Sequence, residues 1–169
     1  MESSLIKEIN KQYVEATICY EDDIKNNPKV SVDSYINLAF LYWSFAFDYF
    51  SFDIPNNISD DYCMIGGNRY KKILELGLNK YPNNVELHFW EKYFSHIIYG
   101  ENFSVIDCLD LIEKYDMGES KVPYFFLYLF DKEKYKKQRD ELMKEIEKVP
   151  TAKNFYIGAI IRGKDNRED

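Results

Sequence analysis

Residues 35–52 read YINLAFLYWSFAFDYFSF, and this stretch decides the fold. Nine of its eighteen residues are aromatic, none is glycine or proline, and Ile36 is the only β-branched residue. This composition favours a helix over a strand. A helix that is apolar on most of its sides must be surrounded by other helices. We therefore expect Tyr35–Phe52 to form the hub of the fold, and we call it the hub helix.

The composition indicates a folded chain made mainly of helices. The 169 residues are 46% hydrophobic and 17% aromatic, which is enough for one domain with a sizeable core. Seven glycines and five prolines are too few for a β-sandwich with many turns. The expected fold class is all-α, either a helix-pair array or an irregular α-bundle of about seven to eight helices. We expect a single α-helical domain over residues 1–161 and a polar, frayed C-terminal tail over 162–169.

Apolar residues recur at steps of three and four along most of the chain, and capping residues precede several of these segments. Gly66 and Gly67 interrupt the third segment and indicate either a break or kink in the helix or a tight approach to a neighbour. The expected helices are 4–25, 31–52, 59–81, 84–99, 103–115, 124–130, 132–149 and 152–161, with loops at 53–58 and 116–121.

Part of the chain has a spacing typical of one helical-repeat family. An aromatic residue, a large apolar residue, a small residue and a proline followed by polar residues occur in order as Tyr70, Leu74, Gly77 and Pro82. This spacing resembles the second helix and exit turn of a tetratricopeptide-type repeat, and the resemblance extends over residues 68–115. The family's Trp-Leu-Gly-Tyr pattern is missing, so the resemblance implies a degenerate array of helix pairs. Such arrays have a concave surface that usually binds a peptide or a protein.

The chain is acidic, with 29 carboxylates against 22 lysines and arginines and a net charge of −7. Affinity for phosphates comes from Lys and Arg, so direct nucleic-acid binding is not expected. An acidic surface suits a basic protein partner, although it also serves ordinary solubility. Two sets of carboxylates are candidates for docking such a partner: Glu21, Asp22 and Asp23, and Asp107, Asp110 and Glu113. The second set is also compatible with a solvated helix face or with acid–base chemistry.

The polar residues of the hub helix share one side of it. Asn37, Ser44 and Asp48 follow helical spacing, which predicts a stripe that faces water, a groove or a partner. Lysine and arginine are absent from Tyr35–Phe52, so we do not expect nucleic-acid bases to stack on its rings. The three polar residues are therefore candidate partner-binding residues.

No residue pattern in the sequence indicates a metal centre, a cofactor or a catalytic nucleophile. His88 and His96 would be about 80° apart around a helix and about 12 Å apart along it, too far to share one metal. The three cysteines, Cys19, Cys63 and Cys108, are odd in number and widely spaced, which fits packing residues in a reducing compartment. We expect no cofactor and no enzymatic activity.

The expected location is the cytoplasm, without membrane contact. The first residues lack the usual pattern of a signal peptide. The longest apolar run is shorter than the roughly 20 residues that span a bilayer.

In its size, acidity and expected location, the chain resembles by type the immunity proteins with which bacteria neutralise their own or their neighbours' secreted toxins. The resemblance implies a non-enzymatic protein that binds a basic, nuclease-type toxin domain. A second hypothesis is a helical-repeat adaptor for a peptide or partner protein. A third is an enzyme or small-ligand protein in which Asn37, Ser44 and Asp48 line a pocket with His88 or His96.

Overall fold

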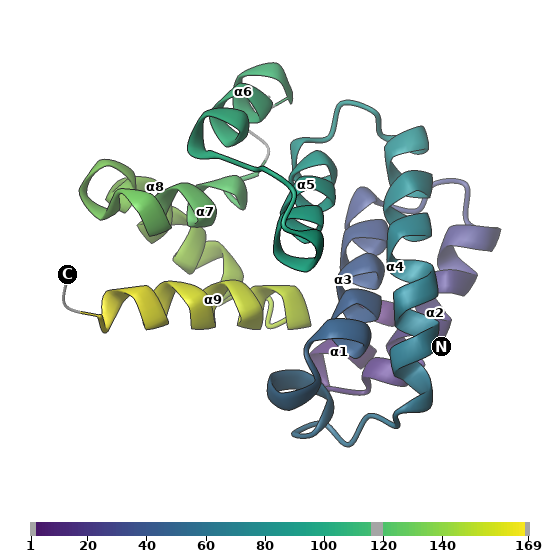
Figure 1. Ribbon diagram of the computed structural model, residues 1–169. Coiled ribbons are helices and arrows are strands. Elements are labelled where there is room, and N and C mark those ends of the chain that lie inside the picture. The colour runs from purple at the N-terminus through teal and green to yellow at the C-terminus, as the bar shows by residue number, and fades with distance from the viewer. Residues whose placement is uncertain (1–2, 116–119, 168–169) are drawn as a thin grey trace. The chain divides into compact units, whose positions relative to one another are not determined.

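The computed structural model describes residues 3–115 and 120–167 (Figure 1). Over these residues it forms nine α-helices and one π-helical turn and contains no strand, which confirms the predicted all-α fold. None of the described helices is long and apolar enough to cross a membrane. The elements are α1 Ser4–Ile9, α2 Tyr13–Asn26, α3 Val32–Phe47, the π-turn η1 Tyr49–Asp53, α4 Asp61–Lys80, α5 Val85–Tyr99, α6 Val105–Tyr115, α7 Pro123–Phe130, α8 Lys132–Ile146 and α9 Ala152–Asp165.

The chain divides into two compact units, whereas the sequence predicts a single domain over 1–161. The first unit comprises the described residues up to Tyr81 together with Thr151–Lys153, so it contains α1 to α4, η1 and the start of α9. The second unit comprises the described residues from Pro82 to Pro150 and from Asn154 onward, with α5 to α8 and the rest of α9.

Most of the predicted hub helix forms α3, which is the centre of the first unit. Eleven of its sixteen residues are buried, and Leu38, Leu41 and Phe45 are fully enclosed. α4 lies along α3 in the opposite direction (Figure 1), and α2 also packs against it. Each large apolar side chain contributes roughly 1.5–3 kcal/mol when it is buried. Burial of α3 is therefore a main source of stability in this unit.

α4 approaches α3 so closely at Gly66 that the two backbones touch. A Cβ atom placed on Gly66 would lie 2.2 Å from the carbonyl oxygen of Tyr42. α4 nevertheless runs unbroken from Asp61 to Lys80. Of the two predicted roles for the glycine pair, the structure therefore shows the tight approach and not the break.

The prediction of one helix over residues 4–25 is wrong, because the segment folds as α1 and α2. Lys11, between them, has a left-handed backbone conformation with a φ of 60°, and it lies where the chain reverses. The hydroxyl of Ser4 then donates a hydrogen bond to the carboxylate of Asp23 at 2.9 Å. In one straight helix these two residues would be about 28 Å apart, so their contact requires the break.

The same reversal buries the carboxylate of Glu8, which holds the start of α9 in the first unit. Glu8 accepts hydrogen bonds from the hydroxyl of Tyr20 at 2.7 Å and from the backbone N–H of Ala152 at 2.9 Å. Burial raises the pKa of Glu8, while these two hydrogen bonds and the charge of Lys153 oppose the rise. A carboxylate is favourably placed at a helix N-terminus. Glu8 therefore caps α9 from the other end of the sequence.

The second unit has an aromatic core, and two of its helices begin at capping residues. Rings from α5 and α7 pack together, including those of Phe89, Trp90 and Phe125. Asn84 and Asp131 cap α5 and α8 by accepting backbone hydrogen bonds, as expected of short polar side chains directly before a helix.

The predicted frayed tail is wrong for residues 162–165, because α9 continues to Asp165. The carboxylate of Asp165 accepts hydrogen bonds from the hydroxyl of Tyr128 and from the guanidinium of Arg139, the latter at 3.0 Å. These contacts fix the end of the helix. The loop predicted at 116–121 falls mainly on 116–119, which lie outside the described residues.

Replacement of Gly66 by alanine tests the backbone contact between α3 and α4. The new methyl group must displace the main chain of Tyr42, so we expect Gly66→Ala to lower the free energy of unfolding by about 2 kcal/mol. Gly67→Ala is the matched control, because a Cβ there would lie 3.8 Å from the side chain of Ala46, an ordinary contact distance. We expect it to be neutral or stabilising by up to about 1 kcal/mol, since alanine favours helices. Urea unfolding of the two variants measures both effects, and equal stability would contradict the close approach.

Candidate partner-binding surface

The hub helix changes geometry at its C-terminal end. α3 stops at Phe47, Asp48 leaves the helical conformation, and η1 follows, whereas the sequence predicts an α-helix to Phe52. The turn has the hydrogen bonds of a π-helix, which join residues five positions apart. One runs from the N–H of Ile54 to the carbonyl of Tyr49 at 3.0 Å. π-Helical turns are frequent at functional sites.

This turn directs one aromatic ring inward and two outward. Phe52 is buried, and its ring lies 4.7 Å from that of Tyr13. Phe50 is 81% exposed and Tyr49 45% exposed. The rings of these two residues contact each other edge to face, with their centres 5.5 Å apart. The turn therefore holds two large rings in solvent while its base is fixed in the core.

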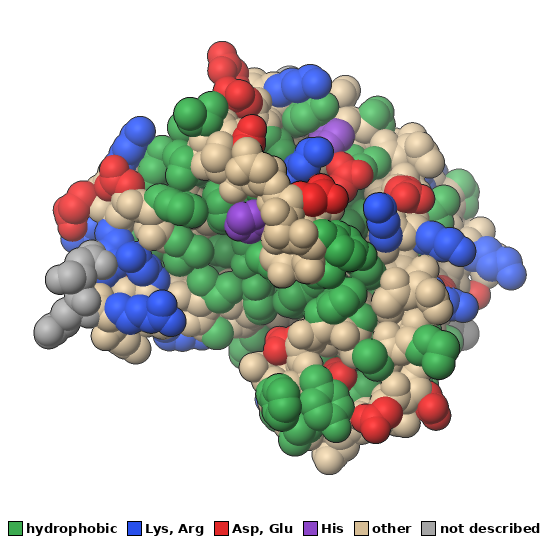
Figure 2. Space-filling model, in the orientation of Figure 1, with side chains coloured by type: hydrophobic (Ala, Val, Ile, Leu, Met, Phe, Trp, Pro, Cys, Tyr) green, Lys and Arg blue, Asp and Glu red, His purple; other side chains and the backbone are tan. Residues whose placement is uncertain are grey.

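The exposed rings belong to a larger apolar surface with acidic neighbours. Figure 2 shows hydrophobic side chains grouped at the lower end of this view, where the turn after α3 lies in Figure 1, with carboxylates next to them. We call this region the aromatic turn surface and define it by the exposed or half-exposed residues Phe47, Asp48, Tyr49, Phe50 and Ile54. Contiguous apolar patches rimmed by polar groups are typical of interaction sites.

No positive side chain lies near this surface in the sequence. Lysine and arginine are absent from residues 30–68, which contain Asp33, Asp48, Asp53, Asp60 and Asp61. The charged side chains that this segment contributes are therefore all acidic.

Asp53 lies at the base of the turn, where its negative charge is unfavourable. Its side chain is buried, and Oδ1 has no hydrogen-bond partner among the described residues. Burial, reinforced by the charges of Asp48 and Asp60, raises its pKa to about 7. Burial also raises the pKa of Asp48, although hydrogen bonds from Ser51 oppose that rise. A proton on Asp53 therefore stabilises the folded turn.

The predicted polar stripe of the hub helix is largely inside the protein. Asn37 is only 6% exposed and Ser44 only 1%. The Asn37 amide donates to the hydroxyl of Tyr20 at 3.2 Å, and the Ser44 hydroxyl donates to the carbonyl of Phe40 at 2.9 Å. The prediction that these two residues face water, a groove or a partner is therefore wrong. Asp48 is half-buried at the aromatic turn surface.

The first acidic set makes contacts within the first unit. Glu21 accepts a hydrogen bond from the hydroxyl of Tyr42 at 2.6 Å and forms an ion pair with Arg69. Asp23 accepts the hydrogen bond from Ser4 described above. Asp22 is exposed and accepts a hydrogen bond from Asn26, one turn later in α2, at 2.7 Å.

The second acidic set is exposed on α6. The carboxylate of Asp107 accepts hydrogen bonds from the backbone N–H and the hydroxyl of Ser104, both at 2.7 Å, and these bonds hold its pKa below the usual range. Asp110 and Glu113 lie one turn apart on the same side of the helix, next to the exposed apolar residues at 106 and 109. α6 therefore presents an acidic and partly apolar face.

The residues considered for chemistry make structural contacts. The ring of His88 donates to the carbonyl of Pro82 at 2.7 Å, and that of His96 bonds the carbonyl of Glu101 at 2.7 Å. Burial raises the pKa of the Cys108 thiol to about 12. Among the described residues, no group of three or more His, Cys, Asp and Glu side chains could hold a metal ion.

Comparison with known proteins gives no relative: no protein-family model, no curated protein and no solved structure matches this chain. The tetratricopeptide-like resemblance of residues 68–115 and the likeness to immunity proteins therefore stay predictions.

The pH dependence of folding tests the position of Asp53. A pKa raised from 3.8 to about 7 means that the folded state keeps a proton which the unfolded chain has lost. The contribution of Asp53 to stability is therefore full below about pH 4 and is lost as the pH rises through about 7.

We expect Asp53→Asn to be more stable than the original chain at pH 8 and similar to it at pH 4, because asparagine carries no charge at either pH. Urea unfolding across this range measures the difference between the two proteins. A constant difference at all pH values would show that Asp53 has an ordinary pKa.

Proposed function

We propose that this protein acts by binding a basic protein partner through the aromatic turn surface. The observation that carries the proposal is the pair of solvent-exposed rings, Tyr49 and Phe50, held on a π-turn whose base is buried. Large aromatic residues dominate the energy of protein interfaces. Because buried Phe52 anchors the turn, the backbone that carries these rings loses little conformational entropy on binding.

The charge around the rings supports a partner rich in arginine and lysine. A guanidinium group can stack on an aromatic face and pair with a carboxylate such as Asp48 at the same time. The net charge of −7 would also attract a basic protein and raise its association rate. The exposed carboxylates Asp107, Asp110 and Glu113 on α6 would add to this long-range attraction.

A basic toxin domain is the partner class that fits these features best. An immunity protein needs a stable scaffold, a surface complementary to the toxin and fast association, and it needs no chemistry of its own. The proposal is therefore a non-enzymatic, cytoplasmic inhibitor that covers a basic domain, such as the nucleic-acid-binding face of a nuclease. The gene directly upstream is the first place to seek the toxin, as a secreted protein with a toxic C-terminal domain.

Replacement of an exposed phenylalanine tests the proposed surface. Phe50→Ser should weaken binding to the toxin domain about 30-fold, which corresponds to about 2 kcal/mol for the loss of a central interface ring. Phe130→Ser is the matched control, because Phe130 is also exposed, at 63%, but lies in the second unit. Biolayer interferometry with the purified toxin domain measures both variants. Equal affinity of the two would place the interface elsewhere.

The acidic face of α6 is expected to affect the rate at which the partner associates. Replacement of Asp107, Asp110 and Glu113 by their amides should slow association about tenfold at low salt and leave dissociation nearly unchanged, as for charges at the rim of an interface. The effect should shrink as salt is added, because exposed charges are screened. An unchanged association rate at low salt would exclude this face from steering.

A further inference from the structure

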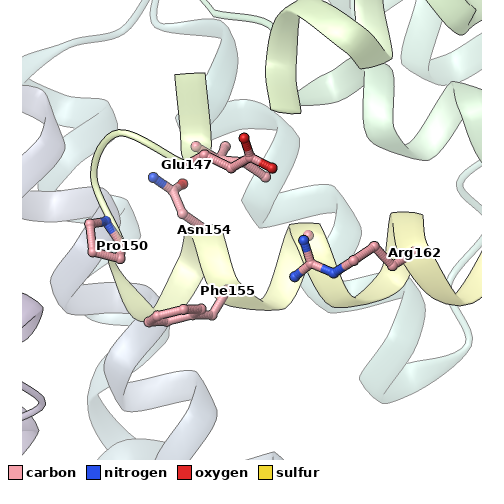
Figure 3. Close-up of a pocket in the computed structure, with 7 residues that line it drawn as sticks. Glu147, Pro150, Asn154, Phe155 and Arg162 are labelled. Carbon is pink, nitrogen blue, oxygen red and sulfur yellow. The ribbon is translucent and has the colours of Figure 1, made fainter. Parts of the chain in front are cut away.

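A small pocket opens in the second unit, where the end of α8 leads into α9 (Figure 3). Its volume is about 160 Å³. Pockets for larger organic ligands measure about 300–1,000 Å³, so this one suits a molecule of the size of an amino acid. The lining residues are Ile146, Glu147, Pro150, Asn154, Phe155, Gly158 and Arg162.

The pocket has one charge of each sign and an apolar lining. Figure 3 shows the guanidinium of Arg162 reaching back along α9 and the carboxylate of Glu147 on the α8 side of the same space. Neither side chain forms an ion pair with a described residue. Ile146, Pro150 and Phe155 supply apolar surface between them.

The guanidinium of Arg162 lies where a side chain at residue 158 would clash with it, so its position requires Gly158. A Cβ atom on residue 158 would lie 2.9 Å from one terminal nitrogen of Arg162 and 3.2 Å from the other. The guanidinium therefore rests against the bare backbone of α9, where a side chain would displace it. The amide of Asn154 donates to the carbonyl of Val149 at 2.7 Å and holds the connection that forms the other wall.

We propose that this pocket binds a small zwitterion, namely an α-amino acid with an apolar side chain. Its carboxylate would pair with Arg162, its ammonium group with Glu147, and its side chain would lie on Phe155. A simple anion would meet the carboxylate of Glu147, and a simple cation would meet Arg162, so only a zwitterion satisfies both groups. This site lies apart from the aromatic turn surface in the chain, and it does not depend on the proposed function.

Titration of the full chain with L-leucine tests the pocket. In ¹⁵N-resolved NMR spectra we expect saturable shifts of amide signals within residues 146–162, with a Kd on the order of 1 mM, as suits two exposed charge pairs. Isovalerate and isopentylamine each keep the apolar body and one charge, and both should bind several-fold more weakly. No saturable shift with leucine, or equal binding of the three compounds, would overturn the proposal.

Two glycine variants test whether leucine binding depends on where the guanidinium of Arg162 lies, because both variants keep its charge. Gly158→Ala keeps the charge but pushes the guanidinium out of the pocket, so leucine should bind about tenfold more weakly. Gly163→Ala adds the same methyl group to the same helix where no atom lies within 4 Å, and it should bind leucine unchanged.

The variant Glu147→Gln gives an independent test that does not depend on α9. Loss of the carboxylate should remove the preference for leucine over isovalerate, because the amide no longer attracts the ammonium group or repels a simple anion. If Gly158→Ala and Gly163→Ala behave alike, or if Glu147→Gln keeps the preference for leucine, the zwitterion site is refuted.

Discussion

The burial of α3 is the constraint on which the rest of the first unit depends. A sixteen-residue helix with eleven buried positions needs neighbours on nearly every side. α4 satisfies this requirement by backbone contact at Gly66, and α2 contributes from another side. The C-terminal end of the hub leaves the core through a π-turn that keeps Phe52 inside. The rings of Tyr49 and Phe50 on this turn are exposed to solvent, as is that of Phe47 at the end of α3.

The carboxylates of the first unit separate into two groups with different physical roles. Glu8, Glu21 and Asp23 accept hydrogen bonds from other elements and so hold α1, α2, α4 and the start of α9 in place. Asp48 and Asp53 lie at the turn, where burial raises their pKa values and no cation of the described residues lowers them. Removal of one partner from a buried polar pair lowers the free energy of unfolding by more than an exposed ion pair adds to it. The first three carboxylates are therefore structural, whereas the two at the turn are placed where burial disfavours their charge.

The sequence predicts best those features that depend only on residues close together in the chain, such as helix caps. Asn84 and Asp131 cap their helices because a short polar side chain can reach the first free N–H groups of the same helix, whatever the rest of the fold does. The sequence did not predict the reversal at Lys11, which is compensated by contacts such as the one from Ser4 to Asp23, nineteen residues apart. It also placed Asn37 on the surface, because helical spacing shows which residues share a side and not what covers that side. The aromatic turn surface was missed for a related reason: nine rings in eighteen residues indicate a core, and only the π-turn reveals which of them point outward.

Hydrogen–deuterium exchange of the chain, alone and with the toxin domain that we propose as its partner, tests the central claim most directly. The claim is that the hub is core along its length and presents a partner surface only at its C-terminal end. It predicts that α3 exchanges slowly in both states, since its backbone amides open only with the unit, and that the partner newly protects the segment 47–54. New protection confined to α6, or an α3 that exchanges as fast as the surface helices without a partner, would contradict it.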